Sequence, residues 1–253
     1  MATPTLALDA LGQNNAADMY KHKLLVFPPN IRHIVILIPN EAHESLDQPK
    51  ESWPLINETY LPQIAIVYPG TMVTWFNGDR DHDHRVSLTS NRNTENLLFD
   101  SGTIKFNEAS GAIVLSDIGT YNYYEENVCQ NLQDPQSCNF VMRGNVTVVS
   151  KADPDGSPTT FSDNHSGALT GVTILPDTAG VIMMPAQDSG NYVQDLKSKG
   201  FAIDSTYNFD STRPGGQEGT GDTQTLIVWT TYGIDLDEVI STLQEIMSEL
   251  PYI

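Results

Sequence analysis

Short apolar segments separated by turn residues recur along the first 150 residues of the chain. His33–Ile38 is a continuous, mostly β-branched run, and such a run predicts a strand that is buried on both faces. Ile64–Val67 and Met72–Phe76 flank the turn pair Pro69-Gly70, which predicts a strand, a turn and a second strand. About seven short strands spaced in this way are typical of a β-sandwich. The remaining strands are expected at 85–88, 112–115, 120–124 and 145–149.

The pattern changes after residue 150. Residues 151–170 contain few apolar side chains and indicate a linker. Beyond them the apolar positions predict the order βαββα, and this order indicates a small α+β domain of ferredoxin-like type. We therefore divide the chain into an arm (1–29), a sandwich domain (30–150), a linker (151–170) and an α+β domain (171–253). In the last domain, strands are expected at 180–184, 201–209 and 225–230, and helices at 189–199, ended by Gly200, and at 235–250.

Composition narrows the classes of partner. A chain of 253 residues with 39% hydrophobic residues fits two domains with real cores. The formal net charge is −19, which repels nucleic-acid phosphates and anionic membranes. No apolar run approaches the roughly 20 residues needed to span a bilayer. The charge predicts either plain solubility or a preference for cations and basic protein partners.

Three features bear on the compartment. No basic segment followed by an apolar segment is visible at the start of the sequence. Cys129 and Cys138 are the two cysteines, and their spacing suits a local disulfide. Glycosylation sequons occur at Asn57, Asn145 and Asn164. The cysteines and the sequons together favour an extracytoplasmic location, whether secreted, periplasmic or on the cell surface.

Residues 31–149 resemble the cupredoxins, the family of the blue-copper proteins. The resemblance implies a cupredoxin-type Greek-key β-sandwich and a copper site at one end of it. It is carried, in the family's order, by Met72-Val-Thr-Trp-Phe-Asn-Gly-Asp79, His84-Arg-Val86, Phe99-Asp-Ser-Gly102, Gly119-Thr-Tyr-Asn-Tyr123 and Met142-Arg-Gly-Asn-Val-Thr-Val148.

The ligand loop departs from the family pattern. Two histidines, a cysteine thiolate and a weak axial methionine hold the copper of a blue-copper protein. The resemblance assigns the first histidine to His84 and the axial methionine to Met142. Glu125 stands where the cysteine belongs, and no histidine occurs between Gly119 and Gly144. The resemblance therefore implies a site that lacks the blue copper–thiolate bond.

A second histidine adds to this site. His82 and His84 lie two positions apart in Asp81-His82-Asp83-His84, so a strand would place both imidazoles on one face. Histidine and carboxylate donors suit copper, with zinc as another possibility. The metal-ligand set that we predict is thus His84, His82, Glu125 and Met142.

Simpler interpretations of the same residues stay open. The histidines and Glu125 could be solvated loop residues, and Met142 could be ordinary core packing. Cys138 lies four residues before Met142 and could be a thiolate ligand if it is not disulfide-bonded to Cys129. His33 begins an apolar run and is expected to be a hydrogen-bonded residue at a strand end.

Two functions follow. The first is a secreted cupredoxin-like protein that binds a metal ion, copper before zinc, for copper handling or redox work. The second is a cupredoxin-fold module that has lost its metal and acts through protein–protein contacts. The sequence leaves open an enzymatic role, a redox or assembly partner, and an oligomeric state.

Overall fold

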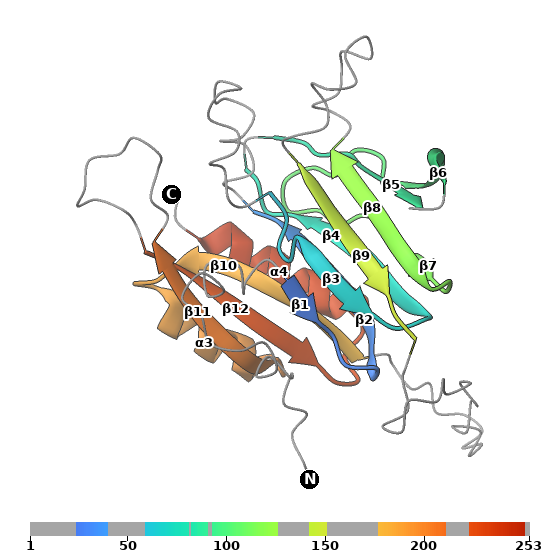
Figure 1. Ribbon diagram of the computed structural model, residues 1–253. Helices are drawn as coiled ribbons and strands as arrows, with labels where there is room; N and C mark the ends of the chain where they lie inside the picture. The colour runs from blue at the N-terminus through green and yellow to red at the C-terminus, as the bar shows by residue number, and fades with distance from the viewer. Residues whose placement is uncertain are drawn as a thin grey trace.

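In the computed structural model, the described residues form two six-stranded β-sheets and two helices, and most of them lie in strands (Figure 1). The structure describes residues 24–39, 59–80, 82–90, 93–125, 142–150, 177–210 and 223–250.

The first sheet, sheet A, has the strand order β1-β3-β9-β8-β5-β6. Its strands come from the region expected to form a sandwich, except that β1 lies within the predicted N-terminal arm. There Leu24–Val26 pair in parallel with Ile64–Ile66. The strands are β1 (Leu24–Val26), β3 (Ile64–Val67), β5 (Val86–Ser90), β6 (Asn93–Asp100), β8 (Gly119–Glu125) and β9 (Arg143–Val148).

The second sheet, sheet B, has the order β11-β12-β10-β2-β4-β7. Its central strand β2 pairs in parallel with β10 on one side and with β4 on the other. A strand in this position is covered on both faces, which explains its continuous apolar sequence. The strands are β2 (Ile31–Ile38), β4 (Thr71–Asn77), β7 (Ile113–Leu115), β10 (Asp177–Pro185), β11 (Ala202–Asp210) and β12 (Thr223–Thr231).

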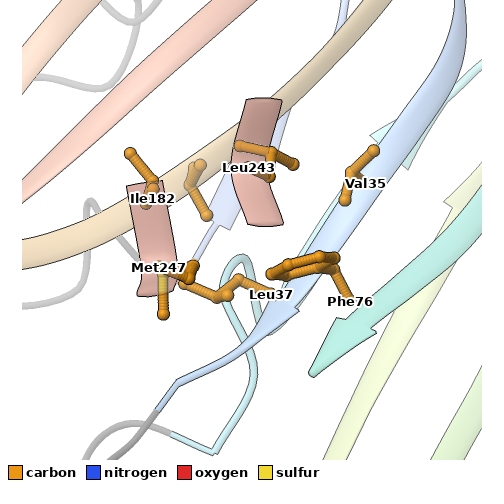
Figure 2. A pocket seen from close by; sticks show the side chains of 7 residues that line it. Val35, Leu37, Phe76, Ile182, Leu243 and Met247 are labelled. Carbon is orange, nitrogen blue, oxygen red and sulfur yellow. The ribbon is translucent and has the colours of Figure 1, made fainter. Parts of the chain in front are cut away.

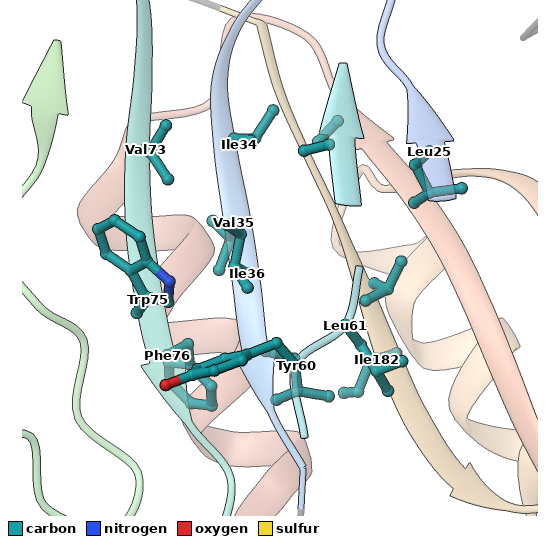
Figure 3. Packing of buried hydrophobic residues seen from close by; sticks show 14 of the residues in the cluster. Leu25, Ile34, Val35, Ile36, Tyr60, Leu61, Val73, Trp75, Phe76 and Ile182 are labelled. Atoms are coloured by element: carbon teal, nitrogen blue, oxygen red, sulfur yellow. The ribbon is translucent and has the colours of Figure 1, made fainter. Parts of the chain in front are cut away.

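The space between the sheets holds the main core. Alternate residues of β2 and β4 point into it, including Ile34, Ile36 and Trp75, which are fully buried (Figure 3). The Trp75 ring packs edge-on against Tyr123 of β8, with 5.3 Å between ring centroids, and it stacks on Phe99 of β6 at 5.5 Å. These contacts join sheet B to sheet A, and the two-sheet arrangement is consistent with the cupredoxin-like sandwich that the sequence predicts.

Two helices cover the other face of sheet B. The first, α3 (Ser189–Ser198), ends as expected, because Gly200 follows it with a left-handed φ of +88°. The second, α4 (Leu236–Glu249), begins at Asp235, whose side chain accepts a hydrogen bond from the Asp237 backbone N–H. Figure 2 shows that Leu243 and Met247 of α4 lie against strands of sheet B; a small apolar pocket between them is lined by Val35, Leu37, Phe76, Val181, Ile182, Leu243 and Met247.

The C-terminal residues follow the predicted order β10, α3, β11, β12, α4. However, their three strands extend the sheet that contains β2 and β4, and they do not close a sheet of their own. A separate ferredoxin-like domain is therefore not confirmed. The physical reason is the edge of β2: this strand of eight residues, six of them apolar, takes β10 as a parallel neighbour, and the pairing covers that edge. The proposed domain boundaries stay predictions.

Candidate metal centre

The loop after β4 brings Asp79 and His84 to one end of the sandwich. Asn77, the last residue of β4, fixes this loop from inside. Its side-chain amide donates to the carbonyl oxygens of His82 and Ile104 at 2.9 and 3.0 Å, and its Oδ1 accepts from the Asp79 backbone N–H at 2.8 Å. His84 then forms a two-way backbone bridge with Ile104. These bonds fix the loop backbone, so both side chains leave it in defined directions.

Glu125 reaches the same place from the other sheet. In β8 the residues Tyr121, Tyr123 and Glu125 alternate with partly exposed ones, so all three point into the sandwich. The register of β8 against β5 places Glu125 opposite Val86. As a result, Glu125 Oε1 accepts a hydrogen bond from the Arg85 backbone N–H at 2.8 Å.

The imidazole of His84 lies between two carboxylates. Its Nδ1 is 3.0 Å from Glu125 Oε2, and its Nε2 is 3.2 Å from Asp79 Oδ2. All three residues are at most 2% exposed. Because both carboxylates are acceptors, an ion-free imidazole satisfies both contacts only when it carries two N–H groups, which is the imidazolium form.

The pKa of His84 reflects this surrounding. Burial by itself lowers it, but the hydrogen bonds and negative charges of Asp79 and Glu125 outweigh burial and raise the pKa to about 9. Two carboxylates and one imidazolium still leave this buried cluster with a net charge of −1. Such a charge is costly unless a further cation or further donors compensate it.

The other two predicted ligands lie beside this cluster. His82 is about one-third exposed, and its Nδ1 is 3.7 Å from the same Asp79 Oδ2 that contacts His84. Met142 is buried just before β9, and its carbonyl oxygen accepts a hydrogen bond from the Glu125 backbone N–H at 3.2 Å. The structure thus places all four predicted residues at one end of the sandwich. It does not arrange them as a finished coordination sphere: within the described ranges, no group of three or more His, Cys, Asp or Glu side chains is set up to hold an ion.

Asp79 is the residue of this cluster that the sequence did not single out. Its signal was its position at the end of the Asn77-Gly78-Asp79 segment, five residues before His84. Cys129 and Cys138 lie outside the described residues, so the disulfide and the alternative thiolate ligand stay predictions. No helix within the described ranges is long and apolar enough to cross a membrane.

Comparisons with known proteins give a limited result. No protein-family model matches the sequence, and no curated protein matches it. Among solved structures, the purple cupredoxin from Nitrosopumilus maritimus is 23% identical, covers 46% of this chain and 99% of its own, and superposes with a TM-score of 0.32. An oxidised amicyanin variant is 20% identical, covers 46% of this chain and 81% of its own, and has a TM-score of 0.30.

Proposed function

We propose that this is a cupredoxin-like metal-binding protein that holds a divalent cation, copper before zinc, at His84 and Glu125. The family resemblance and the spacing of the histidines add Met142 and His82 to the proposed ligand set. The observation that carries the proposal is the buried pair formed by His84 Nδ1 and Glu125 Oε2, at the loop position where the family resemblance expects a ligand. The proposal includes a role for the bound ion, which is copper handling or slow redox work in an extracytoplasmic compartment.

The donor atoms fit such an ion. Imidazole nitrogen and carboxylate oxygen each bind Zn²⁺ at roughly 2.0–2.2 Å, so two of them on one ion lie on the order of 3 Å apart. The separation of 3.0 Å between His84 Nδ1 and Glu125 Oε2 is compatible with this geometry. Asp79 has the place of an outer partner, because it contacts the other ring nitrogen and would hold the proton there.

The charges also fit. A neutral His84 between the ionised Asp79 and Glu125 leaves two buried negative charges, which a divalent cation would cancel. When bound, copper would supply a one-electron couple, and an oxygen and nitrogen donor set would make that site non-blue. The residues of this chain would hold the ion, orient the imidazole through Asp79 and exclude water.

Titration calorimetry with Cu(II) and Zn(II) tests the proposal. The wild-type protein is expected to bind one ion at micromolar concentration, and His84→Gln and Glu125→Gln are each expected to abolish this binding. His33→Gln is the matched control, because it makes the same substitution at a buried histidine that pairs with Met72, at the opposite end of β4 from the site. Absence of binding in the wild type, or binding that His84→Gln leaves unchanged, would refute the proposal.

One observation favours the second function, a metal-free binding or assembly module. His84 already has a carboxylate at each ring nitrogen, so it can act as a buried imidazolium that ties the loop after β4 to β8. The titration decides between the two functions. A count of free thiols in the unfolded, unreduced protein then settles the role of Cys138: none is expected for the disulfide, whereas two would restore it as a ligand candidate.

A further inference from the structure

The C-terminal helix α4 contacts the segment that carries Asp79. Gly78 lies directly under the end of this helix: a Cβ atom added to Gly78 would be 2.7 Å from Met247 Cε and 3.1 Å from Leu37 Cδ1. A side chain at Gly78 would therefore displace the flexible end of Met247 and press on Leu37 and on the Ile38 carbonyl oxygen, which would lie 3.2 Å away, so α4 packs closely on this glycine. The residue just before Asp79 is therefore packed against the helix.

The residue just after Asp79 is bonded to the same helix. Arg80 donates from its guanidinium to the carbonyl oxygen of Met247 at 2.7 Å and to that of Leu250. The last carbonyls of a helix lack partners within it and carry a partial negative charge, so a cation stabilises them. The last turn of α4 has no basic residue, and Arg80 supplies this cation from another part of the chain. The guanidinium carbon also lies 5.3 Å from the centre of the Phe106 ring.

A second attachment lies next to the first. The Asn107 side chain donates to the Gln244 carbonyl oxygen and to Ser248 Oγ, each at 2.9 Å, and the Gln244 side chain donates back to the Asn107 carbonyl at 2.8 Å. The Asn107 backbone N–H in turn donates to the Asn77 carbonyl at 2.7 Å. The end of β4 and the last turns of α4 are thus joined through Asn107 as well as through Arg80.

We infer that α4 positions the candidate metal centre by holding Asp79 between two fixed neighbours, Gly78 and Arg80. Asp79 in turn orients the imidazole of His84 through Nε2. Arg80 is then a positioning residue, because it acts on His84 through the backbone of Asp79. The part of the inference that concerns ion affinity rests on the proposed function, whereas the orientation of His84 does not.

The test compares Arg80→Met, which keeps the unbranched stem of the side chain but removes the guanidinium and its donors, with Val239→Ala. Val239 is fully buried in α4, eight residues and about 12 Å before Met247, so its truncation loosens the helix without removing a bond to the loop. The first readout is the nitrogen-15 NMR signal of the His84 ring in the metal-free protein, and the second is the affinity for Cu(II). Arg80→Met is expected to shift or broaden the ring signals and to weaken Cu(II) binding by about tenfold. Arg80→Lys should restore part of both, and Val239→Ala should change neither.

Asn107→Gly provides an independent variant if Arg80→Met does not fold. Asn107 has a φ of +65°, which glycine adopts without strain, so this change removes the side-chain bonds to α4 alone. It should shift the His84 ring signals in the same direction by a smaller amount. Ring signals that Arg80→Met and Asn107→Gly leave unchanged, or that Val239→Ala shifts equally, would overturn the inference. A wild type that binds no ion would refute the proposed function, and the ring signals would still decide whether α4 positions His84.

Discussion

Lowering the pH below 6.5 is expected to destabilise the protein through His33, a buried residue of β2. His33 Nε2 lies 2.8 Å from Thr74 Oγ1, whereas Nδ1 has no hydrogen-bond partner among the described residues. The sequence predicted a hydrogen-bonded histidine at a strand end; His33 is instead the third residue of β2, and one of its two ring nitrogens has a hydrogen-bond partner. Burial lowers the pKa of His33 from 6.5 to about 4, because a protonated ring would be desolvated without a compensating anion.

The sign and size follow from the two pKa values. Between pH 6.5 and 4 the unfolded chain binds a proton at this position and the folded chain does not, so the free energy of unfolding falls as the pH falls. The full difference corresponds to roughly 3 kcal/mol at 1.36 kcal/mol per pKa unit, and roughly 2–3 kcal/mol of it is lost between pH 7 and 4.5. Such a loss is large against the usual stability of a protein domain.

Urea unfolding of the wild type and of His33→Gln at pH 7 and 4.5 measures this effect. Glutamine does not titrate, and its amide can keep a bond to Thr74 Oγ1. Other titrating groups contribute equally to the pH dependence of both proteins. One of them is Asp100, because its hydrogen bond and charge contact with Arg85 lower its pKa to about 2. The wild type should therefore lose roughly 2–3 kcal/mol more than the variant between the two pH values. An equal loss in both proteins would show that His33 is not buried as a neutral ring.

Three glycine substitutions test the packing of the two sheets and α3. Gly144→Ala should destabilise the protein by about 1–3 kcal/mol in urea unfolding, because the new methyl would lie 2.2 Å from the Tyr123 ring; an unchanged midpoint would contradict that packing. Gly180→Ala should cost a similar amount, since its methyl would lie 2.6 Å from the Trp229 ring in the extension of sheet B. Gly190→Ala is the contrast: it meets no atom within 4 Å and lies in α3, so it should stabilise the protein by about 0.5–1 kcal/mol.

Local patterns predicted most of the strands and both helices. Tyr121, Tyr123 and Glu125 occupy alternate positions of one strand, so their side chains point to the same face of the sheet. Glu125 therefore points inward with the two tyrosines. The contact between His84 and Glu125 depends on a different fact, the register that pairs Val86 with Glu125. No local pattern specifies which strands pair, so only the family resemblance could bring these two residues together from the sequence.

Two further features depend on contacts between distant parts of the chain, so local sequence patterns could not predict them. The parallel pairing of β10 with β2 joins segments about 145 residues apart, and the apolar sequence of β2 suits several neighbours equally well. Asp79 follows a strand in a Gly-Asp segment, and such a segment ordinarily indicates a solvated turn. In the structure Asp79 is fully buried, and its two neighbours contact α4, which packs on Gly78 and accepts hydrogen bonds from Arg80.

The most direct test of the account is a crystal structure of the protein grown with Cu(II), with anomalous data collected at the copper edge. The account predicts a single strong anomalous peak within roughly 2.0–2.2 Å of His84 Nδ1 and of a Glu125 carboxylate oxygen, with Asp79 still at His84 Nε2. An empty anomalous map at this end of the sandwich, with His84 held between Asp79 and Glu125, would contradict the metal site and leave the metal-free module as the function.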